Sequence, residues 1–338
     1  MIPPHLTVNS ATFAKVPSAT FKFSIRHLER AILASFVYPR FRPPCSNSCL
    51  LLKNALTSAI ERLTQAQVGS PRMNAEVLLM FTLGCDRAYL YAHPERELTA
   101  DEETRYHEAL HHRAEGVPSQ YITGHQEFWG MDLIVSPAVL IPRPETEHLI
   151  ETLLPLARAM RQPKIVDVGT GSGCIALALA KELPNADIHA TEVSPAALEV
   201  AEANAARLQM STRIQFHDTN LLSGLQEDFD FVVSNPPYVG ESEEDQVQLE
   251  VRRFEPRGAV FAGPTGLEVI ARLIPEAHEK LKFGGWLLVE ISGTIVEGVR
   301  ELLAEWSNLQ ITKDLQGIPR VAAAQKYALP KLTNLWLK

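Results

Sequence analysis

The hydrophobic pattern of the chain changes near residue 145, and the first part predicts helices. Apolar side chains recur every three or four positions from Leu52 to Leu63, which is the spacing of one buried helix face. Ser70 and Pro71 predict the start of a second helix, with Ser70 as its cap, and Gly84 predicts its end.

A third helix is predicted by two polar residues that can cap each other. Thr99 is followed three positions later by Glu102, which is the spacing of a capping box, and Gly116 is placed to end this helix. We therefore expect a small helical domain over residues 51–116.

The rest of the chain predicts a linker and then an α/β fold. Residues 117–142 indicate a linker, because aromatic and aliphatic side chains alternate over 121–135 around two glycines, as is typical of a hairpin. Residues 143–338 alternate β-rich runs with helical runs, which predicts a parallel sheet with crossover helices. We expect strands at 164–168, 187–192, 213–217, 229–234 and 286–291, with a weaker terminal pair at 309–312 and 321–327.

The first predicted strand runs into a glycine-rich turn and then into a predicted helix over residues 174–183. Glycine lets the backbone turn tightly and lets a ligand approach the main chain, because it has no Cβ. Such turns lie at the carboxyl edge of the sheet, where α/β proteins bind ligands. Because dinucleotide enzymes carry a similar loop, the turn alone does not define the ligand. Its candidate residues are Asp167, Gly169, Thr170, Gly171, Ser172 and Gly173.

Two acids at the ends of the next strands indicate a nucleotide-like ligand. Glu192 closes the second strand 25 residues after Asp167, where its carboxylate can accept hydrogen bonds from both hydroxyls of a ribose. Asp218 ends the third strand and is placed to contact an adenine amino group. A solvated loop acid is the alternative at both positions.

The fourth strand is followed by Asn235, Pro236, Pro237 and Tyr238, a motif suited to the transfer of a methyl group onto a planar nitrogen. Two prolines directly after a buried strand are unusual, because proline cannot donate to a sheet ladder; a simple strand terminator is the alternative. The Asn235 side-chain oxygen and the Pro236 carbonyl can each accept one N–H of an –NH2 group. Tyr238 can then pack its aromatic ring against the flat substrate group. We therefore expect Asn235, Pro236 and Tyr238 to be catalytic, in a direct in-line displacement without a covalent enzyme intermediate.

Composition sets the first 50 residues apart. They contain one acid, Glu29, against six bases, with many Ser, Thr and Pro residues. An organellar transit peptide has this composition, but so does an extension without function or a misassigned start, which we favour. We expect a poorly ordered basic extension over residues 1–50 and a cytoplasmic protein, with organellar import as the alternative.

The remaining bulk properties narrow the classes of partner. With a net charge of −8, the 338-residue chain has no overall attraction to a phosphate backbone, which disfavours a nucleic-acid substrate. No apolar run is long enough to span a bilayer. His107, His111 and His112 indicate a solvated helix face rather than a metal site. We therefore expect a monomer that binds neither a metal nor a membrane.

With these motifs located, the chain resembles the release factor glutamine methyltransferases, the PrmC/HemK family, over roughly residues 50–328. The shared motifs together are far more specific than any one of them. They are Gln120-Tyr121-Ile122 with Gly124 and Glu127-Phe128, residues 140–147, residues 167–173, residues 235–238, and Phe254-Glu255-Pro256 followed by Gly266-Leu267.

The resemblance implies a fold, a cofactor and a substrate. The fold would be a class I S-adenosylmethionine-dependent methyltransferase domain, with a Rossmann-like, mostly parallel seven-stranded sheet, joined to an amino-terminal helical domain that helps to hold a protein substrate. The reaction would be N5-methylation of the glutamine in the Gly-Gly-Gln motif of class 1 peptide-chain release factors, which modulates translation termination. By motif, the cofactor residues are the glycine turn with Glu192, Asp218, Thr219 and Asn235, and the substrate residues are Asn235, Pro236, Pro237 and Tyr238, with Arg143, Pro144 and Glu145 at the pocket entry.

The sequence departs from the family pattern at two positions. Thr219 stands where relatives often have a bulky residue near the adenine, and Val296 stands where relatives often have Gln, after Glu290 and Gly293. Two other functions stay open: a nucleic-acid adenine methyltransferase, whose exocyclic amine poses the same geometric problem, and a non-catalytic cofactor-binding module. The acidic balance and the lack of a basic recognition domain disfavour the first, and the intact motifs disfavour the second.

Overall fold

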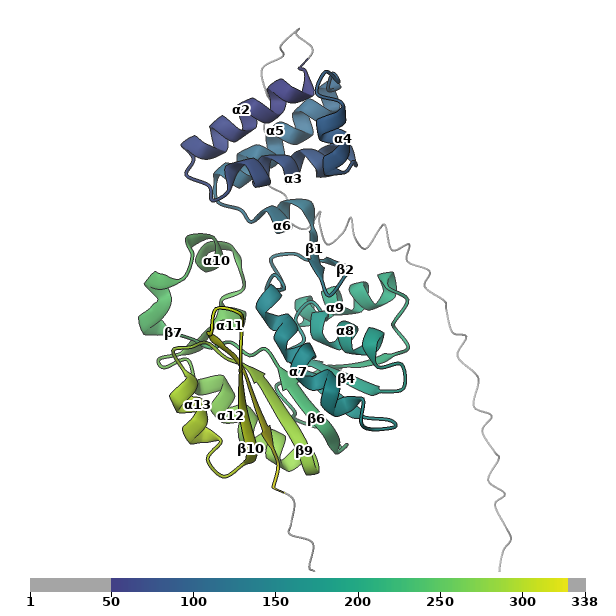
Figure 1. Cartoon of the computed structure of the whole chain (residues 1–338), viewed down its shortest axis with the longest axis vertical. Coiled ribbons are helices and arrows are strands. Elements are labelled where there is room, and N and C mark those ends of the chain that lie inside the picture. The colour runs from purple at the N-terminus through teal and green to yellow at the C-terminus, as the bar shows by residue number, and fades with distance from the viewer. Residues whose placement is uncertain (1–49, 328–338) are drawn as a thin grey trace, which may run out of the picture.

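The computed structural model describes residues 50–327, which form a group of helices stacked against a larger α/β body (Figure 1). The predicted basic extension over residues 1–50 lies outside the described residues, apart from Leu50. Within the described part, no helix has both the length and the hydrophobicity needed to cross a membrane.

Four helices form the first unit and bury a common apolar core. They are α2 (Leu52–Gln65), α3 (Pro71–Leu83), α4 (Arg87–Ala92) and α5 (Ala100–Ala114). Leu63, Leu78 and Tyr106 are among the side chains buried between them. The predicted capping box is confirmed: the Thr99 hydroxyl accepts from the Glu102 N–H, and the Glu102 carboxylate accepts from the Thr99 N–H.

The predicted capping role of Ser70 is wrong. Its side chain accepts no capping hydrogen bond, because its φ of 48° is in the left-handed region and an N-cap residue normally has extended angles. The side-chain amide of Asn74 instead donates to the carbonyls of Gly69 and Ser70. Pro71 in the first turn and Gly84 at the end of α3 lie where the sequence places them.

The segment after the helices is part helix and part hairpin. Its elements are α6 (Ser119–Thr123), β1 (His125–Phe128) and β2 (Met131–Ile134). The predicted hairpin is confirmed from His125 onward, but residues 121–123 are helical, since Gly124 ends α6 with a left-handed cap.

The main sheet is mostly parallel and has seven strands among the described residues, which confirms the predicted fold class. Its order is β10-β11-β9-β6-β3-β4-β5, and β11 is the strand that runs antiparallel to its neighbours. β9 begins five residues earlier than predicted, because a register irregularity lets the glycine-bearing segment 282–285 join the strand. The bounds are β3 (Lys164–Val168), β4 (Asp187–Glu192), β5 (Ile214–Asp218), β6 (Phe229–Ser234), β9 (Leu281–Glu290), β10 (Ser307–Lys313) and β11 (Pro319–Gln325).

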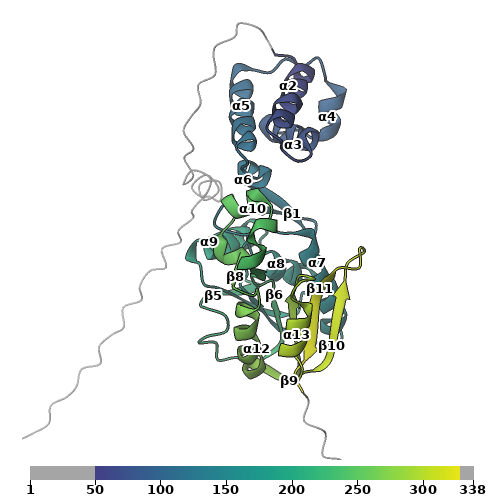
Figure 2. The ribbon, with the colours of Figure 1, turned by 90° about the vertical axis from the view of Figure 1, so that its left-hand side faces the viewer.

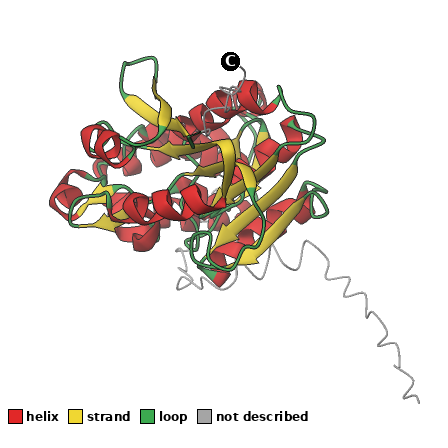
Figure 3. Ribbon diagram, turned by 90° about the horizontal axis from the view of Figure 1, so that it is seen from below, coloured by secondary structure: helices red, strands yellow, loops and turns green. Residues whose placement is uncertain are grey.

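Helices cover both faces of this sheet (Figures 2 and 3). Ile165 packs in the core under α7 and α8, whereas its neighbour Val166 packs in the core under α12 and α13, because successive strand residues point to opposite faces. Both faces are therefore buried, as parallel sheets require. The helices are α7 (Glu147–Ala157), α8 (Cys174–Glu182) and α9 (Pro195–Arg207) on one side, and α12 (Glu268–Lys280) and α13 (Val296–Leu302) on the other.

Several short elements near the carboxyl edge complete the fold. They were not predicted, because two to six residues are too few to show a period. They are η1 (Pro144–Thr146), β7 (Val239–Gly240), η2 (Glu241–Gln246), α10 (Leu249–Phe254), α11 (Arg257–Val260) and β8 (Phe261–Gly263).

One buried arginine ties the helical unit to this edge. From α5, Arg113 donates through Nε to the Asn74 side chain at 2.7 Å and through Nη1 to the Val117 carbonyl at 3.1 Å. Its Nη2 lies 2.9 Å from the Glu250 carboxylate on α10. A single guanidinium group thus joins three segments of the chain.

Asn204 on α9 joins the hairpin to the glycine turn. Its side-chain oxygen accepts from the Ile134 N–H at 2.7 Å, and its amide donates to the carbonyls of Ile134 and Ser172, both at 2.9 Å. The side chain is fully buried. Its removal therefore leaves buried backbone groups without partners.

We expect Asn204→Ala to lower the free energy of unfolding by about 2–5 kcal/mol, because each orphaned buried polar group costs about 1–3 kcal/mol. Urea unfolding followed by circular dichroism measures this. Glu202→Ala on the exposed side of the same helix is the control and should change stability by less than about 0.5 kcal/mol. Equal stability of the two variants would contradict the anchoring role.

Candidate functional site

A cavity of about 570 Å³ opens at the carboxyl ends of β3, β4 and β6. It brings together most of the predicted cofactor residues. Apolar side chains such as Val139, Ile175 and Leu221 complete its wall. The predicted residues that line it are Gly169, Thr170, Gly171, Ser172, Glu192, Thr219 and Asn235.

Backbone amides hold the Glu192 carboxylate at the rim of this cavity. One oxygen accepts from the Gly171 N–H at 2.9 Å, and the other accepts from the N–H groups of Val193 and Ser194, each at 2.9 Å. Gly171 has a φ of 56°, a conformation that glycine adopts without strain. The carboxylate is thus fixed before any ligand arrives.

Asp167 supports the glycine turn from beneath and is not among the residues lining the cavity. Its Oδ2 atom accepts from the Thr170 hydroxyl at 2.6 Å and from the Ala176 N–H at 3.2 Å. Complete burial raises the pKa of Asp167 to about 7, although both hydrogen bonds oppose this rise. Its place indicates a structural contribution to the turn.

The two predicted adenine-side residues differ in their placement. Thr219 lines the cavity; its N–H donates to the Glu192 carbonyl at 2.9 Å and its hydroxyl donates to the Ser223 carbonyl at 2.8 Å. Asp218 is exposed and is not among the lining residues. Gly173, which caps the start of α8, also lies outside the lining.

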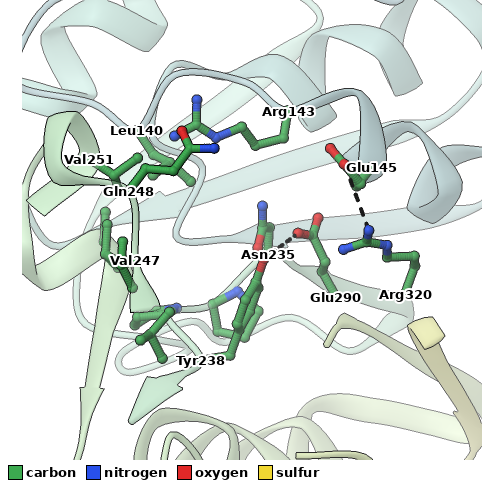
Figure 4. Close-up of a pocket in the computed structure, with 15 residues that line it drawn as sticks. Leu140, Arg143, Glu145, Asn235, Tyr238, Val247, Gln248, Val251, Glu290 and Arg320 are labelled. Atoms are coloured by element: carbon green, nitrogen blue, oxygen red, sulfur yellow. Dashed lines mark hydrogen bonds and ion pairs between the residues drawn. The ribbon is translucent and has the colours of Figure 1, made fainter. Parts of the chain in front are cut away.

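A second cavity, of about 410 Å³, lies on the other side of the Asn-Pro-Pro-Tyr motif (Figure 4). Asn235, Pro236 and Pro237 line both cavities and so form the wall between them. The predicted entry residues Arg143 and Glu145 line the second cavity, whereas Pro144 begins η1 beside it. Its other lining residues include Tyr238, Val247, Gln248, Val251, Glu290 and Arg320.

Hydrogen bonds orient the two polar side chains of the motif. The Asn235 amide nitrogen donates to the buried Thr146 hydroxyl at 3.1 Å, which leaves its Oδ1 atom as the outward acceptor. The Tyr238 phenol donates to Oε1 of Glu290 at 3.1 Å. Burial, with the nearby Glu290 charge, raises the pKa of Tyr238 above its usual value, so the phenol stays neutral near pH 7.

Glu255 holds the entry segment in place. Its carboxylate accepts from the Ile141 N–H at 3.1 Å and pairs with the Arg143 guanidinium. Burial raises the pKa of Glu255, and the charge of Arg143 works in the opposite direction. The other entry residue, Glu145, lies 3.7 Å from Arg320 of β11.

Gly266 packs against the backbone of the motif. It has a φ of 83°, and a Cβ atom on it would lie 2.5 Å from the carbonyl oxygen of Tyr238. Any side chain at this position would therefore push the motif out of place. This close approach explains why position 266 carries a glycine, although it lies 28 residues after Tyr238.

Three residues that sequence reasoning did not place in the site are Thr146, Glu255 and Glu290. Each contacts a residue far away in the chain: Thr146 meets Asn235, Glu255 meets Arg143, and Glu290 meets Tyr238. Thr146 and Glu255 belong to shared motifs, and this is the signal that could have suggested them. No local pattern reveals the partners of the three residues.

Comparisons with known proteins agree with this architecture. The PrmC N-terminal domain model matches residues 54–124, and the methyltransferase small domain model matches residues 144–253. Together with the sheet order, these matches define a class I S-adenosylmethionine-dependent methyltransferase with an amino-terminal helical domain.

Relatives give the family. The release factor glutamine methyltransferase of Koribacter versatilis is 54% identical over 279 residues, covering 82% of this chain and 99% of the relative. The enzyme of the same name from Moorella thermoacetica is 39% identical and covers 82% of this chain and 99% of the relative. This chain belongs to the release factor glutamine methyltransferase family. Among solved structures, the ribosomal protein L11 methylase of Lactobacillus delbrueckii subsp. bulgaricus matches 55% of this chain and 81% of that chain, with 22% identity and a TM-score of 0.42.

Proposed function

We propose that this protein methylates the side-chain amide nitrogen, N5, of the glutamine in the Gly-Gly-Gln motif of class 1 peptide-chain release factors, with S-adenosylmethionine as methyl donor. The activity would modulate translation termination. It would act as a cytoplasmic monomer, without a nucleic-acid substrate of its own. The family of the chain and the geometry of its two cavities support this function.

The single observation that carries the proposal is the shared wall between the two cavities. A transfer enzyme must hold donor and acceptor in contact, with the reacting atoms in line. Asn235, Pro236 and Pro237 border the glycine-turn cavity on one side and the second cavity on the other. A donor in the first and an amide in the second would meet at this wall.

The first cavity suits the methyl donor. When bound, S-adenosylmethionine supplies a methyl group made electrophilic by the attached sulfonium. The fixed Glu192 carboxylate would accept hydrogen bonds from the ribose hydroxyls, and the glycine turn leaves room for close contact with the backbone. The remaining polar wall would consist of Thr170, Ser172 and Thr219. Asp167 would stabilise the glycine turn from beneath. Asp218 is exposed outside the cavity lining, so any contact with the adenine would come from outside this cavity.

The second cavity suits a primary amide. The Oδ1 atom of Asn235 and the backbone carbonyl of Pro236 would each accept one N–H, which points the nitrogen lone pair at the methyl group. Tyr238 would pack against the flat amide. In the proposed transfer the amide nitrogen would accept the methyl group, the electron pair of the donor's S–C bond would remain on sulfur, and the nitrogen would then lose one proton to solvent.

The entry to the second cavity is built from paired charges. Arg143 pairs with Glu255, and Glu145 lies near Arg320, so these charges are partly neutralised before a substrate arrives. Neutralised side chains hold the shape of a rim without strongly attracting phosphate. This arrangement favours a neutral peptide loop over a nucleic-acid strand.

The substrate class is tested by labelled methyl transfer. We expect incubation with radiolabelled S-adenosylmethionine to label a purified class 1 release factor and to leave tRNA, rRNA and duplex DNA unlabelled. A release factor with Gln→Ala in its Gly-Gly-Gln motif is the control and should stay unlabelled. Label that appears only on nucleic acid would overturn the proposal in favour of the adenine alternative.

The role of Asn235 is tested by separating turnover from binding. We expect Asn235→Ala to lower kcat by about a hundredfold or more while changing the Kd for S-adenosylmethionine only a few-fold, because the contact positions the acceptor nitrogen. Steady-state kinetics and calorimetry measure the two quantities. Asn308→Ala, at an exposed position of β10, should leave both unchanged. Parallel losses of kcat and affinity in Asn235→Ala would argue against a positioning contact.

The role of Glu192 predicts the opposite division of effects. We expect Glu192→Ala to raise the Kd for S-adenosylmethionine by about 10–100-fold, because hydrogen bonds to a charged group contribute about 1.5–3 kcal/mol. Calorimetric titration measures this, with Glu199→Ala on the exposed face of α9 as the control. An unchanged Kd would refute the ribose contact.

A further inference from the structure

We propose that Gln248 recognises the main chain of the substrate next to the target glutamine, by pairing its side-chain amide with the N–H and C=O groups of a glycine. This inference rests on the proposed function and deepens it, because it names the part of the substrate that the rim of the second cavity recognises. It is drawn from a polar lining side chain that has no hydrogen-bond partner among the described residues.

Each polar side chain that lines the second cavity, except Gln248, has a hydrogen bond or an ion pair with another side chain. These contacts fix the groups in place and restrict the directions in which they can bind a ligand. The partnered residues are Arg143, Glu145, Asn235, Tyr238, Glu290 and Arg320.

Gln248 is the exception within the part of the chain that the structure describes. Its side-chain amide makes no hydrogen bond there, and it does not cap α10, although Gln248 directly precedes that helix. Figure 4 shows this side chain extending inward from the wall that Val247 and Val251 form. A donor –NH2 group and an acceptor oxygen are therefore both open to a ligand at the mouth of the cavity.

The backbone around Gln248 is held, although the side chain is not. The Gln248 carbonyl accepts from the Arg252 N–H at 3.1 Å, and the Arg252 guanidinium donates to Asp245 at 3.0 Å. Glu250, two positions further on, lies 2.9 Å from the buried guanidinium of Arg113. Because the main chain is already fixed, a ligand has only the side chain of Gln248 to order, which limits the entropic cost of binding.

The chemistry of the proposed substrate makes main-chain recognition necessary. The two glycines that precede the target glutamine have no side chains, so an enzyme can recognise them only through their backbone groups. In an extended backbone, the N–H and C=O of one residue point to the same side, as they do in an antiparallel sheet. A primary amide matches this pair, because its oxygen accepts from the N–H while its nitrogen donates to the C=O.

The apolar neighbours of Gln248 add to the effect of such a pair. Leu140, Val247 and Val251 line the same cavity, so a backbone that enters beside them loses water. Desolvated N–H and C=O groups that find no partner are costly. Gln248 supplies both partners at this wall, and it therefore favours a chain that presents bare backbone before its glutamine.

The test measures methyl transfer to a purified class 1 release factor by the full chain and its variants. We expect Gln248→Met, which keeps the length of the side chain and loses both hydrogen bonds, to lower kcat/KM for the release factor by about tenfold or more. Gln248→Glu keeps an acceptor but loses the donor, so kcat/KM should fall by about fivefold or more. The Kd for S-adenosylmethionine should stay within about twofold in both variants, because Gln248 does not line the first cavity.

Gln246→Met is the matched control. Gln246 is exposed at the end of η2 and is absent from the lining of both cavities, so this variant should keep the wild-type kcat/KM. A second comparison uses two class 1 release factors that differ in sequence around the Gly-Gly-Gln motif. The loss in Gln248→Met should agree within about twofold between them, because the contact is made to the backbone that they share.

Three results would overturn the inference. They are a Gln248→Met enzyme with wild-type kcat/KM, a Gln248→Glu enzyme with wild-type kcat/KM, and a loss that is confined to one of the two release factors. Thermal unfolding separates lost recognition from misfolding; if Gln248→Met does not fold, Gln248→Ala replaces it with the same expected loss. Failure of the proposed function is distinguishable, because the wild type itself would then leave both release factors unlabelled.

Discussion

The hydrogen bond from the Asn235 amide to the buried Thr146 hydroxyl decides what the motif offers to a ligand. An amide side chain carries a donor and an acceptor of nearly the same shape, so its chemistry depends on which end faces the cavity. With the nitrogen turned inward, the wall between the two cavities presents oxygen atoms, as the capture of an –NH2 group requires. The surrounding structure serves to keep this wall in place.

Several elements of the fold hold this wall in position. β6 delivers the motif, β9 places Glu290 behind it, and Gly266 lets the later segment pack against its backbone. On the side of the first cavity, Asp167 and Glu192 hold the glycine turn by accepting hydrogen bonds from its polar groups. These contacts use oxygen acceptors fixed by the protein, so little reorganisation is needed when ligands bind.

Sequence reasoning succeeded where local pattern decides the structure. Strand periodicity located all seven strands of the main sheet, and the spacing of Thr99 and Glu102 predicted a capping box that the structure contains. It failed for Ser70, whose backbone angles depend on how the chain enters α3. It also missed the Thr146 and Glu290 contacts, because partners that lie 89 and 52 positions away become neighbours only through the order of the strands.

Arg113 has a mechanical consequence for how a protein substrate is held. Its guanidinium, on α5, joins α3, Val117 after α5, and α10. Around the start of α10, Val247, Gln248 and Val251 line the second cavity. Any tilt of the helical unit would break hydrogen bonds to this buried cation, which is costly. One buried arginine therefore links the helices to the segment that forms part of the cavity wall. Such a link would restrain the distance between the outer helices and the point of methyl transfer.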